Sequence, residues 1–396
     1  MTDKKFVGAL YTYPWDLTDE GVDEALDRII GLTGCTEIQL TPSYHVSNYF
    51  LPHNPSGPMR FGENGAVFFM PQLSRYEATE IKPRVSHYVT TPDYFERIVD
   101  AINRKGLVFS AWNVYFFNHY LSEKYPQFAK HDVFGTPYFG QISPSSVDAQ
   151  EFAVALTQEV MDRFKPHAVR IEALQRQMWR HGMLKNKMQG DISEQCQFML
   201  GLCFNPSSMQ NAREAGIEAD KFREDVEAWM RPRLARISTE EDTQPVNAQW
   251  MSEAFDGRLR QYLNVLNRHT TDLWLRVADI IKKGGGKVQM DYLADGVRTE
   301  THGLEPRINE HIDRLTAGLT ATGDDAKAQV QDYLDIIAPG GELFVPVGPG
   351  NITEAAPVIE RTKAVAEAAA SGALYYNYGL MREEVLGFVG EAIRSV

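Results

Sequence analysis

An arginine and a glutamate, Arg170 and Glu172, stand two residues apart in the alternating stretch 167–174. A β-strand directs every second side chain to the same face, so these two charged side chains share one face, and Val169 and Ile171 share the other. Charged groups inside a barrel are usually paired or used in chemistry, because burying a lone charge is costly. A carboxylate beside a cation suits nucleophilic or acid–base catalysis, and a structural ion pair is the alternative interpretation.

Further carboxylates and many aromatic side chains follow other strand-like segments. Two carboxyl groups can protonate a leaving oxygen and attack or activate water at an anomeric carbon, while aromatic rings pack on sugar faces. The pattern therefore predicts carbohydrate chemistry, with Glu172 as nucleophile or base and Asp291 as general acid. Asp313 competes for the acid role, and Asp295 is an alternative to Asp291. The candidate substrate-binding residues are Arg170, Tyr11, Tyr13, Trp15, Gln39, His45, Trp112, Asn113, Gln289 and Asn377.

Strands and helices alternate along almost the whole sequence. This alternation predicts an α/β fold, a (β/α)8 TIM barrel formed as a single catalytic domain by residues 1–396, with its active site at the C-terminal ends of the strands. A doubly wound open sheet is the alternative, but no Gly-x-Gly-x-x-Gly follows the first strand. The eight predicted strands lie at 6–13, 37–40, 107–113, 167–174, 287–292, 311–316, 343–347 and 373–378.

Two segments are too long for ordinary connections. Residues 44–90, after the second strand, are rich in Pro, Gly, Asn, His and aromatic residues, and residues 175–249, after the fourth, contain helical stretches. We expect both insertions to cover the barrel mouth. The second is also a candidate for a subunit contact in a homo-oligomer.

Composition narrows the classes of partner and compartment. The 396-residue chain has a formal net charge of −13 and a pI near 5.3, without a basic stripe, which argues against nucleic-acid or anionic-membrane partners. We expect no transmembrane span and no leader peptide, because no run of 18 apolar residues and no apolar segment at the start is present. Three cysteines form a sparse, odd set, which favours a reducing, cytoplasmic setting.

No cofactor and no metal ion is predicted. His45 and His53 lie eight residues apart, and no His-Glu-x-x-His spacing occurs. The glycine-containing turn 348–351 follows the seventh strand, where barrels often bind phosphate, although an ordinary strand-to-helix turn is the favoured interpretation. Acidic strand ends with a histidine could nevertheless bind a divalent metal, and this turn could hold a phosphate, so a metal-dependent sugar or phosphosugar isomerase, epimerase or aldolase on the same barrel is the alternative function. A non-catalytic sugar-binding barrel ranks third.

The strand order and the Arg170-x-Glu172 pattern resemble glycoside hydrolase barrels of the α-amylase and α-galactosidase types, whose fourth strand carries Arg-x-Asp or a similar carboxylate. The resemblance gives Glu172 the place of the nucleophile and Arg170 that of the arginine that keeps it ionised. Glu replaces the usual Asp there, and Asp291 replaces the Glu usual at the acid position of strand five.

The chain is more similar to a group of poorly characterised bacterial glycosidase-like barrels, in which a Cys-Phe-Cys-x-x-Cys segment follows strand four. The corresponding segment here, 202–209, keeps one cysteine of the three, Cys203. The resemblance implies a glycosidase-like barrel acting on a small glycoside or an oligosaccharide.

Overall fold

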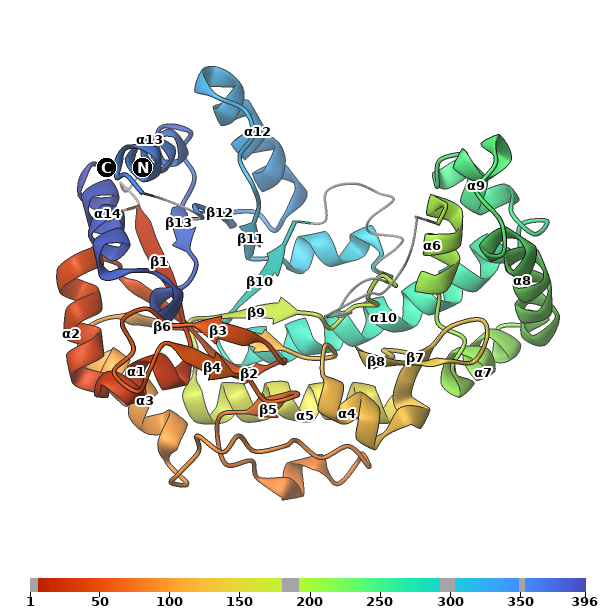
Figure 1. The fold of residues 1–396 in the computed structure, drawn as a ribbon, viewed down its shortest axis with the longest axis horizontal. Helices are drawn as coiled ribbons and strands as arrows, with labels where there is room; N and C mark the ends of the chain where they lie inside the picture. Colours follow the sequence, from red (N-terminus) through yellow and green to blue (C-terminus); the bar gives the residue numbers. More distant parts are fainter. Residues whose placement is uncertain (1–5, 180–191, 293–302, 349–352) are drawn as a thin grey trace.

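The fold is a closed barrel of eight parallel strands, which confirms the predicted (β/α)8 architecture. The computed structural model describes residues 6–179, 192–292, 303–348 and 353–396 (Figure 1). β1 pairs with both β13 and β2, which closes the sheet. In order around the barrel, the strands are β1 (Val7–Thr12), β2 (Glu37–Tyr44), β6 (Val108–Val114), β9 (Ala168–Glu172), β10 (Lys287–Asp291), β11 (Arg314–Thr316), β12 (Glu342–Pro346) and β13 (Gly372–Tyr375).

Helical segments separate consecutive barrel strands and pack their apolar faces against the sheet. The long helix before β10 ends at Lys283, and Gly285 follows it with φ +82°, a left-handed conformation that favours glycine. The glycines at 284–286 thus mark the end of this helix. The main covering helices are α2 (Val22–Thr33), α3 (Tyr94–Arg104), α5 (Val147–Phe164), α10 (Arg258–Lys283), α12 (Gly323–Ile336), α13 (Ala356–Glu367) and α14 (Glu383–Arg394).

The connection after β1 contains two helices, because Pro14 starts α1 (Pro14–Glu20) directly after β1 and Gly21, at φ +89°, separates α1 from α2. The predicted start of strand six is wrong. The strand expected at 311–316 is shorter, because the 3-10 helix η4 (Pro306–His311) occupies its beginning.

The excursion after β2 is built from short strands. β3 (Asn48–Phe50) and β4 (Met59–Phe61) form an antiparallel hairpin, and β5 (Ala66–Val67) pairs antiparallel with the end of β2. A 3-10 turn, η1 (Leu73–Tyr76), precedes α3. The excursion therefore begins at the carboxyl end of a barrel strand, on the side where the active site is expected.

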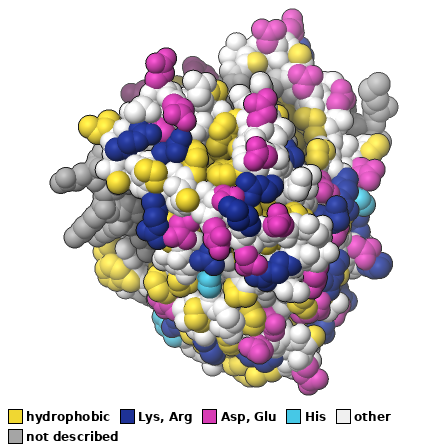
Figure 2. Space-filling model, turned by 90° about the vertical axis from the view of Figure 1, so that its right-hand side faces the viewer, with side chains coloured by type: hydrophobic (Ala, Val, Ile, Leu, Met, Phe, Trp, Pro, Cys, Tyr) yellow, Lys and Arg dark blue, Asp and Glu magenta, His cyan; other side chains and the backbone are white. Residues whose placement is uncertain are grey.

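The excursion after β9 forms a second hydrophobic core beside the barrel. Its elements are α6 (Glu194–Gly201), α7 (Pro206–Glu214), α8 (Ala219–Leu234), η3 (Glu240–Thr243) and α9 (Ala248–Glu253), which lie together at one end of the molecule (Figure 1). Phe204 and Phe222 pack there against Tyr262 of α10. Acidic and basic side chains are interspersed over the face of the molecule on this side (Figure 2).

A third insertion lies between β6 and α5. It contains α4 (His119–Lys124), η2 (Pro126–Phe128) and an antiparallel pair of strands, β7 (Ala129–His131) and β8 (Pro137–Ile142). Near the C-terminus, η5 (Tyr378–Leu380) follows β13. Among the described residues, no helix has the length and apolar character required to cross a bilayer.

A buried charge network closes the N-terminal end of the barrel. Its four members, Glu37, Lys287, Arg314 and Glu342, are each the first residue of a barrel strand. Arg314 Nη1 lies 2.6 Å from Glu37 Oε1, and Nη2 lies 3.0 Å from Glu342 Oε2. Arg314 and Glu37 are both 2% exposed, so each neutralises the charge of the other where water cannot reach it.

The substitution Arg314→Met is expected to lower the free energy of unfolding by about 3–5 kcal/mol, because it leaves Glu37 buried without its cation. Urea denaturation measures the change. The matched control is Arg307→Met, which removes a half-exposed arginine from Asp272 and Glu305 and is expected to cost at most about 1 kcal/mol. Equal losses in the two variants would contradict a stabilising role for the network.

Candidate active site

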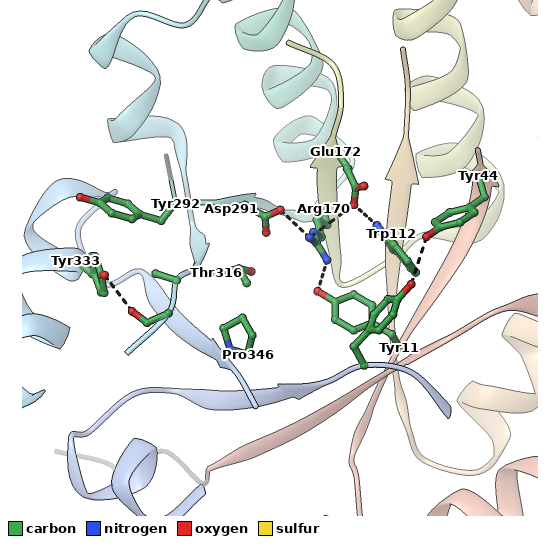
Figure 3. A pocket seen from close by; sticks show the side chains of 13 residues that line it. Tyr11, Tyr44, Trp112, Arg170, Glu172, Asp291, Tyr292, Thr316, Tyr333 and Pro346 are labelled. Atoms are coloured by element: carbon green, nitrogen blue, oxygen red, sulfur yellow. Dashed lines mark hydrogen bonds and ion pairs between the residues drawn. The ribbon is translucent and has the colours of Figure 1, made fainter. Parts of the chain in front are cut away.

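A cavity of about 650 Å³ opens at the C-terminal ends of the barrel strands (Figure 3). Its described lining combines two carboxylates, one cation and six aromatic side chains. Polar groups converging in an aromatic cavity are the usual form of a small-molecule site. The lining residues are Tyr11, Tyr44, Trp112, Arg170, Glu172, Asp291, Tyr292, Thr316, Ala317, Gly318, Tyr333, Pro346 and Tyr376.

Arg170 is the central polar group of the cavity. Its Nη2 lies 2.6 Å from Asp291 Oδ2 and 3.6 Å from Glu172 Oε2, and its Nη1 donates a hydrogen bond to the Tyr11 hydroxyl. The guanidinium also lies 5.2 Å from the centre of the Tyr11 ring. The side chain is 14% exposed. The arginine thus pairs more closely with Asp291 than with Glu172, the partner that the sequence pattern suggested.

The two carboxylates lie close together. The distances of 2.6 and 3.6 Å share Arg170 Nη2, so Asp291 Oδ2 and Glu172 Oε2 can be no further apart than their sum, 6.2 Å. Trp112 Nε1 also donates a hydrogen bond to Glu172 Oε2. Both neighbours of this oxygen are donors, which suits an ionised carboxylate.

The surroundings of Asp291 shift the pKa of its carboxyl group upward. Burial raises its pKa; the charge of Arg170 acts in the opposite direction, and the charge of Glu172 raises the pKa further, so the net shift is upward. Its Oδ1 has no hydrogen-bond partner in the described part of the chain. The two carboxyl groups therefore differ in environment, as an acid and a nucleophile must.

An aromatic wall forms one side of the cavity. Tyr44, Trp112 and Tyr376 line it, and Tyr13 supports it from behind, with its hydroxyl 2.8 Å from that of Tyr376 and 3.1 Å from that of Tyr44. Trp15 stacks on Tyr13 with ring centres 4.6 Å apart. Tyr13 and Trp15 are both buried, so their predicted contact with substrate is replaced by support of the wall.

The two glutamines that were predicted to bind substrate lie deeper in the barrel than the cavity. Gln39 and Gln289 are fully buried inside the barrel, where Gln39 Nε2 donates to Gln289 Oε1 at 3.2 Å. Gln289 shares a face with Asp291 but lies two residues nearer the N-terminal end of β10, and Gln39 precedes the end of β2 by five residues. They form the floor beneath the cavity and do not line it.

Three other predicted binding residues do not line the cavity. Asn113 directly follows Trp112, which lines the cavity, and adjacent strand residues point to opposite faces, so the Asn113 side chain points away from the cavity. The Asn113 side-chain oxygen accepts a hydrogen bond from the Ser43 hydroxyl. Asn377 is buried and caps η5, accepting from Gly379 N. His45 stacks on Tyr44 with ring centres 4.1 Å apart, but lies outside the cavity lining.

Asp313 lies at the opposite end of the barrel from Glu172. It directly precedes β11, accepts a hydrogen bond from Val288 N near the start of β10, and lies 3.3 Å from Lys282 Nζ. The suggestion that it competes with Asp291 for the acid role is therefore wrong. The cause is the misplaced start of strand six. Asp295 lies outside the described residues.

Several lining residues escaped sequence reasoning. Tyr292 and Thr316 end or directly follow barrel strands, so position alone could have included them. Tyr333 comes from α12, and strand alternation carries no signal for a residue on a helix. Only packing of α12 against the mouth brings it to the site.

No group of three His, Cys, Asp or Glu side chains that could hold a metal ion occurs among the described residues. The turn at 348–351, considered for phosphate, lies outside the described residues except for Gly348. The three cysteines are buried free thiols. The metal-dependent alternative thus has no ligand set in the part of the chain that can be described.

The fold is similar to those of solved glycoside hydrolases. One is α-L-fucosidase isoenzyme 2 from Paenibacillus thiaminolyticus (TM-score 0.53, 12% identity, covering 99% of this chain and 49% of that chain). A second is the catalytic domain of β-amylase from Paenibacillus polymyxa (TM-score 0.53, 11% identity, covering 99% and 98%). A third is the PgaB (BpsB) glycoside hydrolase domain from Bordetella bronchiseptica (TM-score 0.53, 10% identity, covering 94% of each chain).

These similarities show that the chain shares its barrel fold with solved glycoside hydrolases, the type of barrel that the sequence resemblance predicted. The chain spans about half the length of the fucosidase and nearly all of the other two domains. No protein-family model and no curated protein matches the sequence. At such low identity the likeness concerns the fold alone, and the chemistry must be argued from the cavity.

A charged cluster attaches the excursion after β2 to α1, behind the aromatic wall. His53 Nδ1 lies 2.9 Å from Glu20 Oε1, and His53 Nε2 lies 3.1 Å from the carbonyl oxygen of Tyr378 in η5. Arg60 of β4 pairs with Asp19 of α1. The cluster therefore connects the excursion both to α1 and to the segment that follows Tyr376.

The pKa values of His53 and Glu20 are shifted in opposite directions. Burial opposes the charge on each group, but their mutual hydrogen bond and the contacts with Tyr378 outweigh it, so the pKa of His53 is raised and that of Glu20 is lowered. The contribution of charged His53 to the free energy of unfolding is fully present below pH 6.5, its ordinary pKa. This contribution is lost as the pH rises through the raised pKa of His53 in the folded protein. That of Glu20 is complete above 4.5 and is lost as the pH falls. Beside the pair lie Asp16, whose pKa burial raises to about 7, and Arg60.

We expect His53→Gln to lower the free energy of unfolding by about 1.5–3 kcal/mol between pH 4.5 and 6.5, because a charge-assisted hydrogen bond is lost. The loss should shrink in alkaline solution, where the wild-type His53 is neutral and the ion pair with Glu20 is absent from both proteins. Denaturation at a series of pH values measures it. The control, His87→Gln, alters a histidine that is 61% exposed and should show no such dependence. A pH-independent loss for His53→Gln would contradict the ion pair.

Proposed function

We propose that the protein is a retaining glycoside hydrolase acting on a small glycoside or oligosaccharide, with Glu172 as the nucleophile and Asp291 as the general acid and base. The observation that carries the proposal is the pair of carboxylates, at most 6.2 Å apart between Oδ2 and Oε2, in an aromatic cavity at the mouth of a glycosidase-like barrel. Retaining enzymes separate their carboxyl groups by about 5–5.5 Å and inverting enzymes by about 6.5–9.5 Å. The bound concerns the two oxygens that face Arg170, and this close approach supports the shorter, retaining separation.

In the first step, a Glu172 carboxylate oxygen bonds to the anomeric carbon as the bond from that carbon to the leaving oxygen breaks. Asp291 gives its proton to the leaving oxygen, so the departing group leaves as a neutral alcohol. In the second step, Asp291, now a carboxylate, takes a proton from water, and the water oxygen replaces Glu172 at the anomeric carbon. Glu172 and the proton on Asp291 are thereby restored.

The surroundings of each group support its role. The Glu172 side chain is 26% exposed, so a substrate can reach it. Trp112 orients it with a donated hydrogen bond, and Arg170 lies at ion-pair distance. The raised pKa of Asp291 favours the protonated form, from which a general acid delivers its proton. When Asp291 becomes a carboxylate, Arg170 at 2.6 Å stabilises the new charge.

Glu172→Gln is expected to reduce kcat/KM for aryl glycosides by roughly 10³-fold or more, because the amide cannot form the covalent intermediate. Steady-state kinetics on a panel of aryl glycosides measures the loss, with circular dichroism to verify folding. The matched control is Asp313→Asn, which changes a carboxylate at the far end of the barrel and should keep wild-type kcat. A folded Glu172→Gln protein with undiminished activity would refute the assignment.

For Asp291→Asn, the expected loss depends on the leaving group. It should reach about 10²–10⁴-fold for alkyl glycosides, which need a proton on the leaving oxygen, and be much smaller for 4-nitrophenyl glycosides, which do not. The ratio of kcat/KM values for the two substrates measures the effect. An equal loss for both would remove Asp291 from the acid role.

The anomeric configuration of the first product should equal that of the substrate, because two displacements at the same carbon restore it. Proton NMR during the first minutes of hydrolysis, before mutarotation, records the configuration. An inverted first product would contradict the two-step mechanism even if Glu172 proved essential.

A further inference from the structure

We infer that Tyr292 and Tyr333 form a binding subsite for the leaving group, and that the substrate is a neutral glycoside of at least two sugar rings. The inference rests on the proposed function, because the terms glycone and leaving group apply only if a glycosidic bond is cleaved. It adds the direction in which the substrate lies and the residues that select its second ring.

Aromatic side chains stand on both sides of the carboxylates. In Figure 3, Tyr292 and Tyr333 lie beyond Asp291, whereas Trp112 and Tyr44 lie beyond Glu172. The rings of Tyr292 and Tyr333 meet edge to face with centres 4.7 Å apart. Both line the cavity. The reacting carboxylates are thus flanked by two separate aromatic surfaces, each able to pack against a sugar ring.

The Tyr333 ring is held in a fixed orientation. Its hydroxyl donates a hydrogen bond to Gly318 O at 3.1 Å and accepts one from Gln329 Nε2 at 3.0 Å. Gln329 in turn accepts from Ala321 N at 3.0 Å, which connects the ring to the start of α12. Because the hydroxyl is already engaged on α12 and its preceding loop, the ring itself is what Tyr333 can offer a ligand.

The order of the carboxylates gives the substrate its direction. A general acid must lie beside the oxygen that it protonates, and that oxygen belongs to the leaving group. Asp291 is the carboxylate on the side of Tyr292, its neighbour in the chain. The leaving sugar therefore lies over Tyr292 and Tyr333, and the glycone lies against the wall that contains Trp112.

The charge of the cavity favours neutral sugars. The described lining contains two carboxylates and one cation, Arg170, which is already paired with both. No second cation is present among the described lining residues, so an anionic sugar would meet the Glu172 carboxylate while Arg170 is already engaged, and its binding would be opposed.

The test compares two substrates with the same glycone, a disaccharide and the methyl glycoside, once the panel above has identified a glycone that is cleaved. Tyr333→Ala is expected to reduce kcat/KM for the disaccharide roughly tenfold, the loss of one good stacking contact, and to leave kcat/KM for the methyl glycoside within about twofold. Tyr333→Phe retains the ring and should retain most of the discrimination. Tyr120→Ala, a tyrosine on α4 outside the cavity, is the matched control.

An equal fall in kcat/KM for both substrates, or no fall for either, would overturn the subsite while leaving the proposed hydrolysis intact. If Tyr333→Ala does not fold, Tyr333→Leu keeps apolar volume without a flat ring and should show the same selective loss. Failure of the wild-type protein to cleave any glycoside would instead refute the proposed function, and that result precedes every Tyr333 variant.

Discussion

The structure of the barrel mouth depends on one cation held between two carboxylates. A lone guanidinium enclosed by a barrel would be costly, and Arg170 is accommodated because Asp291, Glu172 and the Tyr11 hydroxyl surround it. Arg170 and Glu172 come from β9 and Asp291 from the adjacent β10, whereas Tyr11 reaches Arg170 from β1, three strands away from β9 in the closed parallel sheet. Because all parallel strands end at the same rim, residues distant in the chain are brought to one point without long connections.

The interior of the barrel has three polar levels with different consequences. At the N-terminal end, Arg314 and Glu37 are sealed from water and satisfied by each other and by neighbouring strands, so they stabilise and cannot react with a ligand. In the middle, Gln39 and Gln289 satisfy each other. At the rim, the side chain of Asp291 remains 43% exposed to the cavity, so a similar type of ion pair becomes available for chemistry. Access to solvent distinguishes the two ends.

Much of this arrangement could be predicted from alternation alone. The apolar and charged faces of β9 indicated that Arg170 and Glu172 point inward. The same two-residue alternation placed Asp291 on the inner face of β10. Alternation does not report depth, however, so Gln39 and Gln289 were expected at the rim although they lie below it. It also fails where a strand ends early, as it does before Trp15, and it carries no information about a helical residue such as Tyr333.

The helix α10 belongs to two hydrophobic cores at once. Leu259, Tyr262 and Leu263 near its start pack into the core of the helical insertion, whereas Trp274 and Ile281 near its end pack into the barrel core. A helix of 26 residues is about 39 Å long and behaves as one rigid rod. The insertion therefore does not form an independent folding unit. Unfolding of either core would remove the packing partners from one end of α10, so the two cores should unfold cooperatively.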